Sequence, residues 1–186
     1  MHLHVNFDSI QRFAGQFGER EARREYPKVR DWSLTKEARI SIVHAGRVLH
    51  AARMVLPFQL RGFDTLATYH AILVLWVSGL LHCGEKHRED IQPPTGQSVS
   101  QVRLDGDESD AIKSFVYRNI GQPGLTLHST GAGGRRSVVF CPLTSPRLVM
   151  DVGRQVLESN FQGATDHLPP LVENLRNLIR ELGSLP

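Results

Sequence analysis

The most apolar part of the chain lies in the stretch RGFDTLATYHAILVLWVSGLLHCG, from Arg61 to Gly84, whose middle, 71–77, carries no polar side chain. Asp64 or Thr65 is suited to cap a helix here, and Gly84 is suited to end it. A helix that is apolar on every side belongs in the centre of a domain, so we expect this segment to form the core. A bilayer span needs about 20 mostly apolar residues. Because Ser78 interrupts the run, we interpret it as too short to cross a membrane.

Helical spacing of apolar residues predicts two helices before this stretch. The first covers 6–25, and we expect Pro27 to end it because proline has no N–H to donate within a helix. Ser33 or Thr35 can cap the second, which should continue to about residue 56. One stripe of alternating small and large apolar side chains follows this second helix: Ala38, Ile42, Ala45, Leu49, Ala52 and Leu56. We expect the stripe to face the core, where a neighbouring helix can approach closely.

Three more helices are predicted after the central one. The first covers 109–119, and the second begins with Ser145 as N-cap and Pro146 as first residue and continues to about residue 160. The last begins at Pro169 or Pro170 and ends at Gly183. Its apolar face is expected to consist of Leu171, Leu175, Leu178, Ile179 and Leu182.

Two segments rich in proline and glycine separate these helices, at about 91–106 and 121–137, and we expect both to be flexible loops. Residues 99–104 form at best a short extended piece, and SVVFCPL (137–143) is compatible with an extended segment. The pattern as a whole predicts an all-α fold, with about five to seven helices joined by long irregular loops in one domain over 1–186.

Composition is that of an ordinary globular protein, because 40% of the 186 residues are hydrophobic and 22% are charged. The net charge is +3, yet the 22 basic residues are interleaved with 19 acidic ones and form no basic stripe. Direct nucleic-acid binding by this segment is therefore poorly supported. The N-terminus MHLHVNFDSI lacks the pattern of a secretory signal, which favours an intracellular setting. Cys83 and Cys141 are widely separated, as expected for reduced thiols rather than a disulfide framework.

Nine histidines raise the question of a metal site. The densest group is His82, Cys83 and His87, but it lacks the paired cysteines or the HExxH motif that zinc sites use. His44 and His50 are six residues apart on one helix and point in different directions. His70 lies beside the apolar run and has no carboxylate in evident position to orient it. We therefore interpret these histidines as structural or solvated, with no metal ligands in the chain.

Other motifs fail the tests for nucleotide binding or catalysis. TGAGGRR (130–136) lacks the lysine of a P-loop and the last glycine of the dinucleotide fingerprint. GQSVS (96–100) lacks the second glycine of the GxSxG elbow, and Cys141 has no visible base partner. The acidic run DGDESD contains Asp105, Asp107, Glu108 and Asp110, which read as a solvated turn without the EF-hand pattern. The sequence thus predicts no catalytic, cofactor-binding, metal-binding or DNA-binding residue.

In their order along the chain, four segments resemble the C-terminal part of the fungal-specific transcription factor domain: SLTKEARISIVHAGRVLHAARMV, YHAILVLW, VRLDGDESDAIKSFVYRNIGQPG and CPLTSPRLVMDVGRQVLESNFQGATDHLPPLVENLRNLIRELG. This domain is the regulatory middle-homology region of fungal transcription factors with C2H2 or binuclear (Zn2Cys6) zinc modules. The most specific elements are YHAxLxLW at Tyr69–Trp76 and PLVENL at Pro170–Leu175. The resemblance covers most of the chain from about Ser33, and its motifs are structural rather than catalytic.

The resemblance implies an all-helical regulatory domain of a nuclear, sequence-specific regulator of RNA polymerase II transcription, and not an enzyme. Zinc and DNA would be bound by an upstream module that has no counterpart in this chain, so the chain looks like a truncated member. Expected partners are other proteins, other parts of a full-length factor, or a second copy in a homodimer, with no membrane. The alternative is a small helical enzyme or ligand-binding protein that uses the histidine-rich helix ends.

Overall fold

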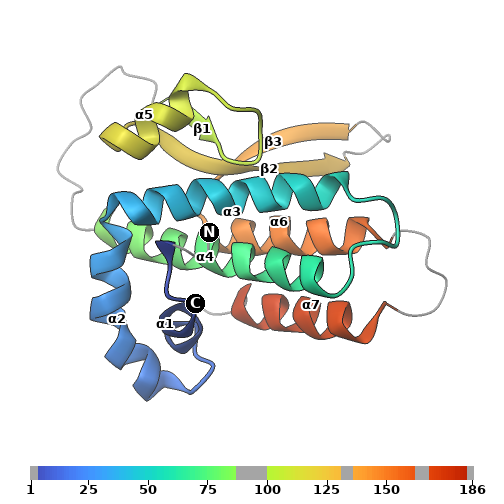
Figure 1. Ribbon diagram of the computed structural model, residues 1–186, viewed down its shortest axis with the longest axis horizontal. Coiled ribbons are helices and arrows are strands. Elements are labelled where there is room, and N and C mark those ends of the chain that lie inside the picture. Colours follow the sequence, from blue (N-terminus) through green and yellow to red (C-terminus); the bar gives the residue numbers. More distant parts are fainter. Residues whose placement is uncertain (1–3, 87–99, 131–135, 162–167, 184–186) are drawn as a thin grey trace.

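The computed structural model describes residues 4–86, 100–130, 136–161 and 168–183, and within them the chain forms seven helices and one three-stranded sheet (Figure 1). The elements, in order, are α1 (Phe7–Phe13), α2 (Glu19–Ser33), α3 (Lys36–Met54), α4 (Phe63–Lys86), β1 (Gln101–Arg103), α5 (Asp110–Arg118), β2 (Gln122–Thr130), β3 (Arg136–Pro142), α6 (Pro146–Ser159) and α7 (Pro170–Gly183). The fold is largely helical, as predicted. The all-α class is wrong in one respect, because the part of the chain that follows α4 and precedes α6 also forms a three-stranded sheet.

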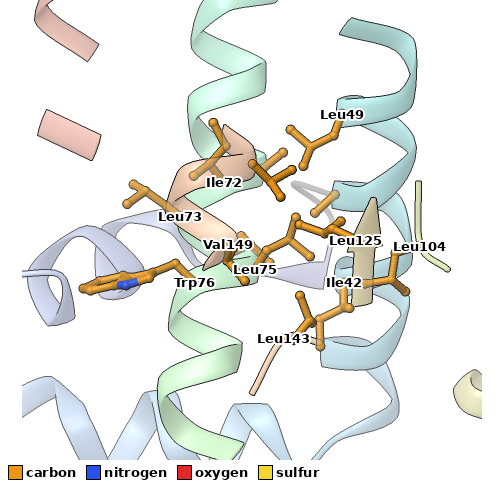
Figure 2. Close-up of a cluster of buried hydrophobic side chains, with 14 of the residues drawn as sticks. Ile42, Leu49, Ile72, Leu73, Leu75, Trp76, Leu104, Leu125, Leu143 and Val149 are labelled. Atoms are coloured by element: carbon orange, nitrogen blue, oxygen red, sulfur yellow. The ribbon is translucent and has the colours of Figure 1, made fainter. Parts of the chain in front are cut away.

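Helix α4 is the centre of the fold, as its apolar pattern predicted. Every residue from Ala71 to Gly79 is buried, and α4 packs against both α3 and α6. Figure 2 shows why all sides of the helix must be apolar: Leu75 points toward α3, whereas Trp76 projects to the opposite side. Ile72 packs against Gly153 of α6. Trp76 is only 4% exposed. Burying a side chain of this size supplies several kilocalories per mole of hydrophobic stabilisation.

The length argument against a membrane span is wrong. The segment Phe63–His82 is long and apolar enough to cross a bilayer by length and composition alone. Ser78 does not interrupt it, because its hydroxyl donates to the Val74 carbonyl of the same helix. Burial is the more informative feature: 67% of the apolar stretch in this helix is buried inside the protein. A helix covered in this way on several sides is the core helix of a packed domain.

Helix α3 confirms the predicted start and most of the predicted stripe. Thr35 is its N-cap, and its hydroxyl accepts a hydrogen bond from the Ala38 N–H at 3.1 Å. The stripe is buried from Ala38 to Ala52. Leu56 was expected to continue it but lies beyond the end of α3 and is exposed.

The N-terminal helix was predicted wrongly, since the chain breaks earlier than Pro27. Gly15 and Gly18 both have positive φ, a conformation open to glycine, and they separate α1 from α2. Pro27 then lies inside α2. The missing proline N–H removes one helical hydrogen bond, but the buried Val29 ties the following turns of α2 to the core.

The ends of α4 also differ from the prediction. The helix begins at Phe63, before Asp64 and Thr65, because the Thr65 hydroxyl donates back to the Leu60 carbonyl and closes the preceding turn. At its other end the helix continues through Gly84 to Lys86, so this glycine does not end it.

The three later helices form where the sequence placed them. Ser109 is the N-cap of α5, Ser145 precedes Pro146 as the N-cap of α6, and α7 covers Pro170–Gly183. The buried face of α7 is rotated from the expected one. It consists of Val172, Leu175 and Ile179, whereas Leu171 and Leu178 are exposed.

The sheet replaces much of the predicted flexible loops. β1 pairs with β2 in parallel, β2 pairs with β3 antiparallel, and the order is β1-β2-β3. The extended segments expected within 99–104 and 137–143 are confirmed as β1 and β3, but the loop expected at 121–137 is mostly strand. Residues 131–135 of this predicted loop, like 91–99 of the other, lie outside the described residues. Figure 1 shows β2 and β3 above α3 and α6.

Candidate functional site

The histidine cluster at the end of α4 is not assembled by the described residues. The His82 ring nitrogen Nδ1 lies 2.7 Å from the Ser78 carbonyl oxygen, one turn back along the helix. The side chain of Cys83 and all of His87 lie outside the described part of the chain. Among the residues that are described, no group of three His, Cys, Asp or Glu side chains could hold a metal ion.

The other three candidate histidines are separated in space and take part in packing. His44 stacks on His4 with ring centroids 6.2 Å apart, and the His70 ring lies 4.6 Å from that of Phe7. His50 Nδ1 lies 3.0 Å from the Asp105 carbonyl oxygen, where it joins α3 to the segment after β1. Each of these rings thus contacts another ring or a backbone carbonyl within the fold.

The acidic run is divided between one buried and three exposed carboxylates. Asp105 is buried and forms an ion pair with Arg53 of α3. Asp107, Glu108 and Asp110 are exposed, and Asp110 pairs with Lys113 of its own helix. The structure thus separates the carboxylates that an acid pair or a cation site would need to bring together.

Cys141 is positioned to be unreactive. It is fully buried in β3, and this burial raises the pKa of its thiol to about 11. The thiolate is the nucleophilic form of cysteine, so the side chain stays protonated near neutral pH. Of the two glycine-containing motifs, 96–99 and 131–135 lie outside the described residues.

Polar side chains bond to the edge of β2 beyond the end of the short strand β1. Thr126 N–H donates to the carboxylate of Asp105, and the Thr126 carbonyl accepts from Arg53. Two residues further on, the amide of Gln155 on α6 accepts from the His128 N–H and donates to the His128 carbonyl. Asp105 and Arg53 are therefore bonded to a strand, and these bonds account for the burial of Asp105.

A shallow groove lies between α1, α4 and α7, with a volume of about 550 Å³. Its lining is mainly apolar and includes Tyr69, Leu73 and Leu182. Burial raises the pKa of the Tyr69 hydroxyl. None of the histidines considered above lines this groove.

The connection between α3 and α4, together with the helix ends that flank it, carries five exposed apolar side chains. We call it the apolar turn, and its exposed members are Met54, Leu56, Phe58, Phe63 and Leu66. Phe63 is 75% exposed and Met54 is 73% exposed. Exposed apolar side chains that gather on one segment are candidates for an interaction site. Single exposed residues elsewhere on the surface need no such explanation.

Asn160, at the end of α6, holds the apolar turn in place. Its side-chain oxygen accepts from Leu60 N–H at 3.0 Å, and its amide group donates to the Val55 and Leu56 carbonyls at 3.0 and 2.9 Å. Its backbone carbonyl accepts from the Phe58 N–H at 2.8 Å. Asn160 is itself only 6% exposed. The apolar side chains are thus displayed by a backbone that is hydrogen-bonded to the core.

Phe58 adds a sign of constraint within the turn. Its φ of 65° is in the left-handed region that bulky residues avoid, and its ring lies 6.3 Å from that of Phe161 in an edge-on arrangement. Strained backbone persists only where the surroundings impose it, and it tends to occur at functional sites. Sequence reasoning missed this site because it took Leu56 as core and as the end of the second helix.

Comparisons with known proteins leave the family of the chain open. No family model, no curated protein and no solved structure matches it.

Proposed function

We propose that the chain is a regulatory and protein-interaction domain that docks a protein partner through the apolar turn. The observation that carries the proposal is the clamp of Asn160, which holds the backbone of the turn at Val55, Leu56, Phe58 and Leu60, next to the exposed side chain of Phe63. A preorganised surface loses little conformational entropy on binding, so more of its contact energy remains as affinity.

The chemistry of the turn favours a partner with an apolar surface. Aromatic residues and methionine are enriched at the centres of protein interfaces, and the turn presents Met54, Phe58 and Phe63. Arg61 and Asp64 lie beside these residues, also exposed and of opposite charge, where they would form a polar rim. The expected occupant is an apolar face on another protein or on another part of a longer factor.

The finer part of the proposal rests on the resemblance alone. The motifs YHAxLxLW and PLVENL resemble the regulatory region of fungal zinc-finger factors. On this reading the domain works in the nucleus, on RNA polymerase II transcription, with zinc and DNA held by an upstream module. Trp76 lies within the first motif and is buried in the core, which agrees with a structural role for that motif.

A transcription reporter tests both parts of the proposal. The chain is fused to an unrelated DNA-binding module, and reporter output is compared for the wild type, Phe63→Glu and Tyr117→Glu. Tyr117 is the matched control because it is an aromatic residue that is 69% exposed and lies on α5. Its new carboxylate can pair with Lys36, whose ammonium lies over the tyrosine ring.

We expect the wild type and Tyr117→Glu to change reporter output equally, and Phe63→Glu to abolish the change. A carboxylate at Phe63 would have to lose its hydration within an apolar contact. Equal output from Phe63→Glu and the wild type would reject the apolar turn as the interface. No effect of the wild-type fusion would reject the regulatory role itself.

Measurements of metal content and of Tm separate this proposal from the enzyme or ligand-binding alternative. That alternative predicts that the purified protein contains stoichiometric metal, or that a metal ion or small ligand raises its Tm. Our proposal predicts neither for this chain. A rise of Tm with zinc that is lost in His82→Ala would favour the alternative.

A further inference from the structure

The outer edge of the sheet is formed by β3, Arg136–Pro142, which carries its charge and its proline only at the two ends. The residues between them, 137–141, read SVVFC. Exposed edge strands are normally protected by charges, prolines or bulges, because their free N–H and C=O groups can pair with another strand. On the opposite side of the sheet the edge strand β1 has only three residues, Gln101–Arg103. β3 is therefore the edge that is open to pairing.

The register identifies which groups of β3 point outward. The Gly124 carbonyl accepts from Leu104, and the Thr126 N–H donates to Asp105, so both residues direct their backbone groups toward β1. The direction of the backbone N–H and C=O groups alternates along a strand, so those of Leu125 and Leu127 point toward β3 and bond to it. Their register partners are Cys141 and Val139.

It follows that Val138 and Phe140, which alternate with those partners, direct their N–H and C=O groups away from the sheet. The contrast with β2 is informative. Beyond the end of β1, the N–H and C=O groups of β2 that point away from β3 form hydrogen bonds with the side chains of Asp105, Arg53 and Gln155. Among the described residues, no side chain or strand is seen to bond to the outward N–H and C=O groups of Val138 and Phe140.

We propose that β3 pairs antiparallel with β3 of a second copy of this chain, about a two-fold axis at Val139, to form a continuous six-stranded sheet. In this register Val139 faces Val139 of the other copy, and Val138 faces Phe140. Pairs of an aromatic with a β-branched residue are favourable across antiparallel strands. Self-pairing brings no like charges together, because 137–141 is uncharged. The inference does not depend on the proposed function.

Exposure of the side chains supports the same arrangement. Val138 is 52% exposed and Val139 is 48% exposed, on opposite faces of the strand. Both are β-branched residues suited to strands, and both would gain a neighbour in the dimer. Two-fold pairing also closes the assembly, because each copy uses the same edge.

The test measures oligomeric state by light scattering and analytical ultracentrifugation across a dilution series. The variants are Val138→Pro, which removes one outward N–H, and Val138→Thr, which keeps the N–H and the branched shape. Proline is tolerated on the outer side of an edge strand, so the fold should survive. We expect dimers for the wild type and Val138→Thr, and a monomer with unchanged circular dichroism for Val138→Pro.

A second variant decides the register even if Val138→Pro fails to fold. In the proposed dimer Val139 and its copy form a pair without mutual hydrogen bonds, with Cα atoms about 4.5 Å apart, which suits a disulfide. Val139→Cys should therefore give a covalent dimer on mild oxidation, and the wild type should not. A monomeric wild type, a dimeric folded Val138→Pro, or failure of Val139→Cys to cross-link would each overturn the proposal. These readouts do not involve the transcription reporter.

Discussion

Removing the side chain of Asn160 should release the apolar turn and destabilise the whole domain. In Asn160→Ala three hydrogen bonds are lost, to Leu60 N–H and to the Val55 and Leu56 carbonyls. The bond to Leu60 is buried and the two bonds to the carbonyls are partly buried, so water reaches the Leu60 N–H only if the turn moves. Each bond contributes about 1 kcal/mol net, and orphaned buried groups cost more.

The expected loss is therefore about 2–4 kcal/mol of unfolding free energy, a large part of the roughly 5–15 kcal/mol typical of a domain. For a chain of this size that corresponds to a fall in Tm of roughly 5–15 °C. The assay is urea and thermal unfolding monitored by circular dichroism. Asn174→Ala is the control, because Asn174 is exposed on α7 and its replacement should change stability by less than about 0.5 kcal/mol.

Hydrogen exchange adds a local readout to this experiment. The Leu60 amide donates directly to the lost side chain, so it should exchange faster in Asn160→Ala by more than the global loss of stability explains. If Asn160→Ala melts within about 1 °C of the wild type and its Leu60 amide stays protected, Asn160 does not hold the turn in the way described here.

Two further predictions concern the sheet. Arg53→Met leaves Asp105 buried without its cation and should cost about 3–5 kcal/mol in urea unfolding, with part of the loss recovered in the double variant that adds Asp105→Asn; equal stability of Arg53→Met and the wild type would contradict this. The raised pKa of Cys141, about 11 against an ordinary value of 9.0, favours the protonated thiol in the folded state. The contribution of the buried neutral thiol to the free energy of unfolding should be complete below pH 9 and be lost as the pH rises toward 11. In a Cys83→Ser background, alkylation of Cys141 at neutral pH should be far slower in the folded protein than in the urea-unfolded protein.

The helices could be predicted from the sequence because their signals are local. Thr35, Ser109 and Pro146 mark helix starts through groups within a few residues, and the structure places a helix at each. The central position of α4 follows from its apolar composition on every side. Pro27 was wrongly predicted to end a helix because the hydrogen bond that proline removes was taken as decisive. Burial of Val29 in the core offsets that loss.

The sheet and the apolar turn could not be predicted in the same way because distant residues create them. β2 contains proline and glycine and has weak alternation of its own, so its sequence reads as a loop. It becomes a strand because β3 pairs with it and because Arg53, 73 residues away, binds Thr126. In the turn, Leu56 is exposed since Asn160, 104 residues away, holds that backbone outside the core. No pattern within either segment carries this information.

The two proposed surfaces lie on different parts of the fold, so their effects should separate. The apolar turn joins the ends of α3 and α4, whereas β3 lies above α3 and α6 in the sheet (Figure 1). In both places a buried polar side chain fixes a backbone segment: Asn160 holds the turn, and Asp105 holds β2, on which β3 is built. Phe63→Glu should therefore leave the dimer intact, and folded Val138→Pro should keep the docking surface of each copy. A single variant that abolished both dimerisation and reporter output would mean that partner docking requires the dimer, and the two sites would then have to be treated as one.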